Sequence, residues 1–173
     1  MTVNKESTVC FSGYRPHKFD FQLSGDEYDL FTKRLHSEIA KAIERGYDTF
    51  LVGMAPSYDL IAAELVVLAR RAYSEMAIKL VCALPYANFK DSKHFNVEWR
   101  ERYDSVIAQA AEIINVTEKD DWSNGCYDLR NKFMVDNSSL LICYSTGKSG
   151  GTKNTIKCAT DNGIKVVNIA ELS

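Results

Sequence analysis

The sequence predicts an α/β fold of the Rossmann-like kind, with a mostly parallel sheet and helices on both faces. Six short apolar runs alternate with five segments of helical periodicity along the 173 residues, which is the order of repeated βαβ units. Three of the predicted strands end in turns that contain glycine. Because right-handed crossovers bring the carboxyl ends of parallel strands to one edge, we expect these turns to meet there.

The predicted elements follow one another in strict alternation. Strands are expected at 8–12, 49–52, 78–84, 112–116, 140–144 and 165–169. The first helix is expected to open at Ser24, which forms an S-x-x-E capping box with Glu27. Apolar spacings of three and four residues predict the other helices at 60–69, 99–110, 127–135 and 153–160. We expect one domain over residues 1–173, long enough to bury a sizeable core.

The composition excludes several classes of protein. A hydrophobic content of 46% and a charged content of 25% are ordinary for a globular chain. The net charge of −2 argues against broad charge-driven binding of nucleic acid. Five scattered cysteines without a CxxC pair favour a reducing compartment. No segment resembles a signal peptide or a membrane span, so we expect a cytoplasmic protein without a membrane partner.

The stretch that carries most functional information follows the fifth predicted strand. Gly150-Gly151-Thr152 lies between that strand and the helix at 153–160. Unpaired backbone N–H groups and the positive end of the helix dipole make such a turn an anion site, and absent Cβ atoms let a phosphate approach. The alternative is a tight turn in which glycine only relieves steric strain.

Two further turns supply candidate ligand-binding residues at the same edge. Ser12 and Gly13 open the turn after the first strand, and Arg15 follows, where a guanidinium could hold a phosphate or carboxylate. Gly53 opens the turn after the second strand. Asp59 then caps the next helix or binds a ribose or base.

Two sites on helices complete the candidate set. Glu64 lies on a very apolar helix, where an unpaired carboxylate is costly, so it is expected to face the ligand or an arginine such as Arg130. Arg130 and Asn131 form a polar pair on a helix that is otherwise rich in apolar residues. The histidines have no metal-ligand spacing, so no metal is expected, and no cofactor is predicted.

The segments CFSGYRPHKF, GMAPSYDLIAAE, ALPY, YDLRNKFMVDNSSLLICY and GGTKNT resemble the YpsA-type family of the SLOG superfamily. That superfamily includes the DNA-processing protein DprA and the Lonely Guy phosphoribohydrolases. The resemblance implies a Rossmann-like fold with a pocket for nucleotides or nucleotide-derived molecules. It does not imply a particular reaction.

Two positions depart from the patterns of the superfamily. Ser57 stands where the YpsA-type motif G-x-A-x-G-x-D has its later glycine, so ligand contact in that turn is less expected. Thr155 stands at the position of the Lonely Guy glutamate in GGxGTxxE. Threonine cannot replace a carboxylate as a general base or stabilise an oxocarbenium ion. Arg130 and Met134 match the R-x-x-x-M helix of those enzymes, so half of the catalytic pair is missing.

Three functions remain open from the sequence. The first is binding or sensing of a nucleotide-derived phosphate ligand by the glycine turn and Arg15. The second is hydrolysis of an N-glycosidic or phosphate bond, which the missing glutamate disfavours. The third is a DprA-like interaction with DNA or protein, which the net charge disfavours. The sequence is also compatible with a homo-oligomer.

Overall fold

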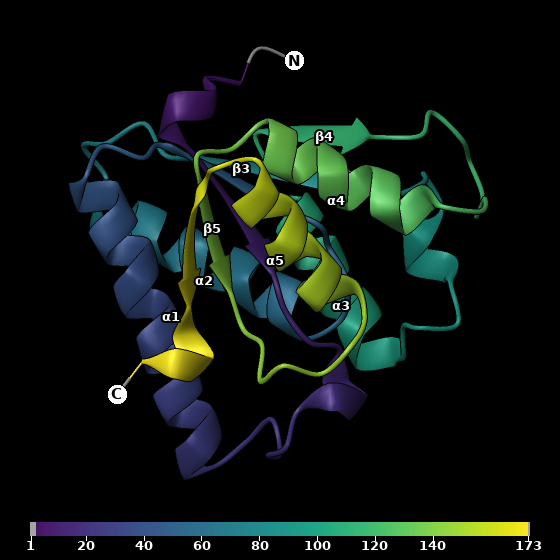
Figure 1. Ribbon diagram of the computed structural model, residues 1–173, viewed down its shortest axis with the longest axis horizontal. Helices are drawn as coiled ribbons and strands as arrows, with labels where there is room; N and C mark the ends of the chain where they lie inside the picture. The colour runs from purple at the N-terminus through teal and green to yellow at the C-terminus, as the bar shows by residue number, and fades with distance from the viewer. Residues whose placement is uncertain (1–2, 173) are drawn as a thin grey trace.

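Parallel pairing of six short strands organises the computed structural model, which describes residues 3–172 (Figure 1). The first two residues and the last residue of the predicted domain therefore lie outside the described part. The strands are β1 (Thr8–Ser12), β2 (Thr49–Val52), β3 (Lys79–Leu84), β4 (Glu112–Asn115), β5 (Leu140–Cys143) and β6 (Lys165–Asn168). Their order across the sheet is β4-β3-β2-β1-β5-β6, and every pairing is parallel. The predicted Rossmann-like sheet is confirmed.

Helices cover both faces of this sheet, as expected. One face carries α1 (Asp26–Glu44), α2 (Tyr58–Ala72) and α3 (Val97–Ile107), and the other carries α4 (Cys126–Asp136) and α5 (Gly151–Asp161) (Figure 1). Side chains alternate along β1, so that Val9 and Phe11 join the first core and Cys10 joins the second. None of the helices within residues 3–172 is both long and apolar enough to cross a membrane.

The direction of chain progression across the sheet reverses between β1 and β5. The chain builds outward from β1 to β4 and then crosses to the other side of β1 to form β5 and β6. The loops after β1 and β5 therefore separate to opposite faces, which leaves a crevice between them. The turns at Gly13, Gly53 and Gly150 follow three adjacent parallel strands, so their predicted convergence at one edge is confirmed.

The start of α1 differs from the prediction. Gly25, and not Ser24, is the N-cap residue, and no side chain caps the helix. Gly25 has φ of 85° and ψ of −170°, a conformation that glycine adopts without steric cost. Asp26, Glu27 and Asp29 lie in the first turn, where carboxylates interact favourably with the helix dipole. The predicted capping box is therefore wrong, because a glycine conformation and acidic residues provide the start instead.

Helix α2 begins earlier than predicted, and its first residue ties it to the sheet. Tyr58 is fully buried, and its hydroxyl donates a 2.8 Å hydrogen bond to the carbonyl of Ile142 on β5. The same ring packs against Gly13, where a Cβ would collide with its carbon atoms. Tyr58 therefore fixes the position of α2 relative to β5 and to the turn that follows β1.

We expect Tyr58→Phe to lower the free energy of unfolding by about 1–2 kcal/mol, because it removes a buried hydrogen bond and leaves the packing intact. Urea unfolding followed by circular dichroism measures the change. Tyr73→Phe is the matched control, since its hydroxyl bonds Glu44 at the surface, and it should leave stability unchanged. Equal losses in the two variants would contradict the structural role of the Tyr58 hydroxyl.

Candidate functional site

A cavity of about 450 Å³ opens at the carboxyl edge of the sheet, beside the switch point. A volume of this size falls in the range of about 300–1,000 Å³ that small-molecule sites occupy. The lining comes from the end of β1, from the loops after β1, β2, β3 and β5, and from residues of α2, α4 and α5. It comprises Phe11, Ser12, Gly13, Tyr14, Arg15, His17, Lys18, Ala55, Asp59, His94, Tyr127, Asp128, Arg130, Asn131, Met134, Gly150, Gly151, Thr152 and Asn154.

The structure brings together nine of the eleven candidate residues that the sequence singles out. All except Gly53 and Glu64 line the cavity. Gly53 lies just beneath it, because its carbonyl accepts a hydrogen bond from the Arg130 guanidinium. Glu64 lies elsewhere: its carboxylate accepts bonds of 2.8 and 3.2 Å from Arg102 on α3. Glu64 therefore faces an arginine, which is one of the two expectations, but that arginine is Arg102 and not the candidate Arg130.

The amino end of α5 provides the first part of the cavity wall. Gly150 is the N-cap residue, with φ of 134°, and Gly151 is the first helical residue. The left-handed φ of Gly150 explains why glycine is needed there. Gly151 has room for a Cβ, whose nearest neighbour would be the Asn131 amide at 3.9 Å. The backbone at Gly151 thus borders open space in the cavity.

Lys18 brings a cation to this helix end. It lies in the short 3-10 helix Pro16–Lys18 after β1, and its ammonium donates a 2.8 Å bond to the carbonyl of Ser149. The ammonium lies so close to Gly150 that a Cβ there would collide with it. Two positive features, the ammonium and the helix end, therefore converge on one side of the cavity.

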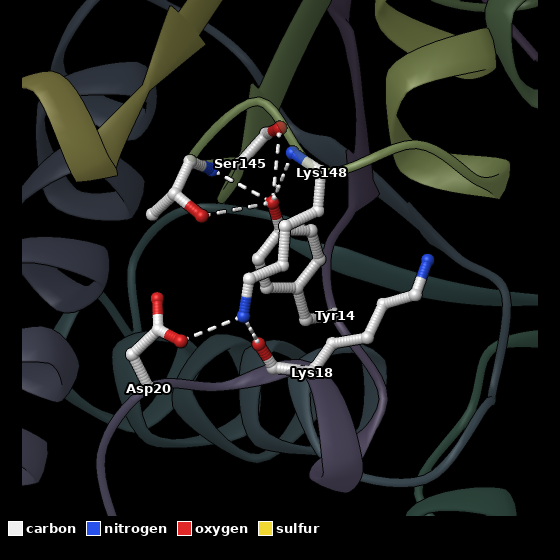
Figure 2. Close-up of polar contacts among 6 residues, drawn as sticks. Tyr14, Lys18, Asp20, Ser145 and Lys148 are labelled. Carbon is white, nitrogen blue, oxygen red and sulfur yellow. Dashed lines mark hydrogen bonds and ion pairs between the residues drawn. The ribbon is translucent and has the colours of Figure 1, made fainter.

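The loop between β5 and α5 is held in place by Tyr14 (Figure 2). The Tyr14 hydroxyl accepts bonds from the amides of Thr146 at 2.8 Å and Lys148 at 3.2 Å. Burial raises the pKa of Tyr14, but these amides and the hydroxyls of Ser145 and Thr146 lower the pKa overall. The loop amides near residue 146 thus bind a phenol oxygen, and they are not open to a ligand.

A second contact closes the same loop onto the segment after β1. The Lys148 ammonium donates bonds of 2.6 Å to the Lys18 carbonyl and 2.7 Å to Asp20 (Figure 2). The ammonium nitrogens of Lys18 and Lys148 each lie 5.8 Å from the centre of the Tyr14 ring, within the range of cation–π attraction. These contacts fix the position of Lys18 relative to the amino end of α5.

Two buried charges form the floor of the cavity. Asp59 and Arg130 are 7% and 4% exposed, and both lie against Gly53, where a Cβ would come within 2.9 Å of their side chains. Burial raises the pKa of Asp59, which the charge of Arg130 and the amide of Ala55 oppose. Burial likewise lowers the pKa of Arg130, which the charge of Asp59 opposes. Each charge compensates the other, so neither attracts a ligand strongly by itself.

Arg15 and Lys18 are lining cations that form no ion pair within residues 3–172. The Arg15 guanidinium lies 5.3 Å from the centre of the Tyr127 ring. Arg15 and Lys18 therefore give the cavity a positive excess that the floor does not cancel. Asp128, on the rim, is the one further carboxylate in the lining.

The two departures from the superfamily motifs have clear structural outcomes. Ser57 adopts a left-handed φ of 67°, and its hydroxyl donates a 2.7 Å bond to the carbonyl of Tyr14. It is fully buried and does not line the cavity. Thr155 is also buried and donates a 2.9 Å bond to the carbonyl of Gly151. Both hydroxyls hydrogen-bond to backbone carbonyls and so stabilise the local turns, and neither side chain faces the cavity.

Sequence reasoning missed several lining residues, among them Tyr14, His17, Lys18, His94, Tyr127 and Asp128. A signal for three of them was available, because Tyr14, His17 and Lys18 belong to the same post-strand turn as Arg15. His94 belongs to the polar segment after β3, which ends at the same sheet edge. Residues 3–172 contain no group of three or more side chains arranged to hold a metal ion.

These features define a Rossmann-like α/β protein with a positively charged cavity at the switch point of its sheet. The model of the YpsA family, described as the YspA SLOG family, matches residues 9–168. The chain belongs to this family, as its resemblance in sequence implied.

Relatives of the chain support this assignment. The UPF0398 protein of Bacillus cereus (strain B4264) is 24% identical over 157 residues, which are 90% of this chain and 83% of the relative. The UPF0398 protein of Bacillus thuringiensis (strain Al Hakam) is 23% identical over 157 residues, which are again 90% of this chain and 83% of the relative. Both relatives are therefore matched over most of their own length.

Solved structures show the same fold. DNA processing protein A from Helicobacter pylori, which binds single-stranded DNA, has a TM-score of 0.58 at 18% identity. The match covers 92% of this chain and 63% of that one. DNA processing protein A from Streptococcus pneumoniae has a TM-score of 0.59 at 15% identity, over 94% of this chain and 50% of that one. The chain thus spans one half to under two thirds of these larger proteins.

The close approach at Gly53 predicts a difference between two glycine variants. Gly53→Ala should lower the free energy of unfolding by about 1–3 kcal/mol, because its Cβ forces the buried charges apart. Gly151→Ala should cause no loss, since its Cβ would meet nothing nearer than 3.9 Å. Urea unfolding of both proteins measures the difference. A fully stable Gly53→Ala protein would show that Arg130 and Asp59 can move away without cost.

Proposed function

We propose that this protein binds a nucleotide-derived ligand through its phosphate, in the cavity between the loops after β1 and β5. The observation that carries the proposal is the convergence of Lys18, Arg15 and the amino end of α5 on one open space. Free backbone N–H groups at a helix start bind phosphate oxygens, and the dipole favours negative charge there. Lys18 is already fixed against Gly150, so little ordering is needed when an anion binds.

The remaining lining supports a ligand larger than phosphate alone. Asp59 and Asn131 offer polar atoms at the floor for hydroxyl groups such as those of a ribose. The Tyr127 ring, beside Arg15, offers a surface on which a planar base can stack. Membership of the YpsA family agrees with such a ligand, since the SLOG resemblance implies nucleotide-type pockets.

A second candidate is binding of single-stranded nucleic acid at the same cavity. The shared fold with the single-stranded-DNA-binding protein of H. pylori favours it, as does the cationic side chain of Lys93, which is exposed next to His94. The net charge of −2 disfavours it. Fluorescence anisotropy with a labelled oligonucleotide, with and without competing mononucleotide, distinguishes the two functions.

We expect Arg15→Gln to weaken binding of AMP or ADP-ribose by about ten- to a hundredfold, since a charge-assisted hydrogen bond contributes about 1.5–3 kcal/mol. Gly151→Val should weaken ligand binding more, because the valine side chain fills the space beside the helix end. Its Cβ has room, so the substitution should not strain the fold. Isothermal calorimetry measures both affinities. Arg71→Gln, on the exposed side of α2, is the matched control and should bind like the parent.

Circular dichroism checks that each variant is folded. If folded Arg15→Gln and Gly151→Val proteins bind as tightly as the parent, the ligand does not occupy this end of the cavity. If the parent binds none of the nucleotides, the proposed function is wrong.

The chemistry at position 155 predicts the absence of one reaction. Because Thr155 is buried and bonded to Gly151, no carboxylate stands where the Lonely Guy enzymes place their glutamate. We therefore expect negligible release of free base from nucleoside monophosphates, as followed by liquid chromatography. Robust turnover would contradict this expectation and would direct attention to Asp59 and Asp128, the carboxylates of the cavity.

A further inference from the structure

Two histidines stand at the mouth of the cavity and take no part in the phosphate site described above. His17 lies in the short helix after β1, next to Lys18, and His94 lies in the loop between β3 and α3. Both line the cavity and both are exposed. The His94 ring lies 6.2 Å from the ring of Tyr127, at an angle of 68°. Residues from two distant loops thus present imidazoles to one opening.

The surroundings of this pair are mostly cationic. Burial, followed by the charges of Arg15, Lys93 and His17, lowers the pKa of His94 from its ordinary value of 6.5. Tyr127 remains neutral, because burial is the main factor that raises its pKa to about 12. Lys18 and Asp128 also line the cavity, and Asp59 and Arg130 compensate each other on its floor. The charges of Arg15, Lys18 and Lys93 exceed that of the one uncompensated carboxylate, Asp128.

The positive charges of this cluster are not balanced unless an anion binds among them. Burial and the neighbouring cations disfavour the protonated form of His94, and negative charge among them favours it. Under the proposed function, the amino end of α5 and Lys18 bind one phosphate at the inner end of the cavity. The histidines line the same cavity on the side of Arg15 and Tyr127, so they are available to a second phosphate of the same ligand.

We propose that His17 and His94, beside Arg15, form a second anion subsite that takes the second phosphate of a pyrophosphate-bearing nucleotide, and that His94 gains a proton when that ligand binds. This inference rests on the proposed function and specifies its ligand class. The first phosphate occupies the amino end of α5 beside Lys18, and the second accepts hydrogen bonds from the imidazole N–H groups. A ligand with one phosphate uses the amino end of α5, Lys18 and Arg15, and it leaves the two histidines without an anion.

The direction of the pH dependence follows from the charges. Above the pKa that His94 has in the complex, the imidazole is neutral in both states and contributes least. As the pH falls below that pKa, binding takes up a proton and the affinity rises. Once the pH falls below the lowered pKa of the free protein, the affinity stops rising. The affinity for a pyrophosphate ligand should therefore increase from about pH 8 to about pH 6.

Calorimetry of the full chain with ADP-ribose and with AMP tests the inference. The bridging phosphates of ADP-ribose do not titrate in this range, whereas the terminal phosphate of AMP titrates near pH 6. Proton uptake with ADP-ribose, obtained by comparing buffers of different ionisation enthalpy, therefore belongs to the protein. We expect ADP-ribose to bind about tenfold more tightly near pH 6 than near pH 8, with uptake of about one proton.

Variants of the two histidines test whether these residues take up the proton. The double variant His17→Asn, His94→Asn should lose the proton uptake and bind ADP-ribose about tenfold more weakly near pH 6. Its affinity for AMP near pH 8 should match that of the parent. His36→Asn, on the exposed side of α1, is the control and should behave as the parent with both ligands.

The possible results separate the two proposals. If AMP binds but ADP-ribose shows no proton uptake, or keeps it in the double variant, the second subsite is wrong and the inner phosphate site stands. If neither ligand binds, the proposed function fails, and the inference fails with it.

Discussion

The pairing of β1 with β5 is the interaction on which the site depends. Val9, Cys10, Phe11 and Ser12 lie in register with Leu140, Leu141, Ile142 and Cys143. This register places the turn that begins at Gly13 beside the loop that begins at Tyr144. The Tyr14 hydroxyl can then bond the amides of Thr146 and Lys148, which in turn fixes the chain that leads into Gly150. A shift of β5 by one residue would exchange its two faces and separate these partners.

Charge burial imposes a second constraint on the same edge. Arg130 is almost fully buried, and its guanidinium is satisfied by the carbonyl of Gly53 and, at 2.8 Å, by the amide oxygen of Asn131. Removing water from an arginine is costly unless such partners exist, and Asp59 supplies the opposite charge. Gly53 is therefore small because a guanidinium passes over it.

The distribution of charge in the cavity agrees with membership of the YpsA family, and it also limits the functions that the cavity supports. Lys18, Arg15 and the amino end of α5 suit a phosphate, whereas the position that carries glutamate in the Lonely Guy pattern holds a buried threonine. These features are the basis on which we propose recognition of a nucleotide, and not cleavage of its glycosidic bond, as the function of the cavity. The YpsA family model covers all the strands and helices concerned.

The sequence by itself determined the order of strands and helices, because apolar periodicity and glycine turns are local signals. It also indicated Arg15, Asp59, Arg130 and the Gly150 turn, since residues after parallel strands must meet at one edge. Tertiary structure alone decided which charges pair: Glu64 bonds Arg102 on a neighbouring helix, and Arg130 turns instead to Gly53. It also decided that Lys18 lies against Gly150 and that His94 joins His17 at the mouth of the cavity. These contacts join residues far apart in the chain, and their partners depend on side-chain packing, which no local pattern records.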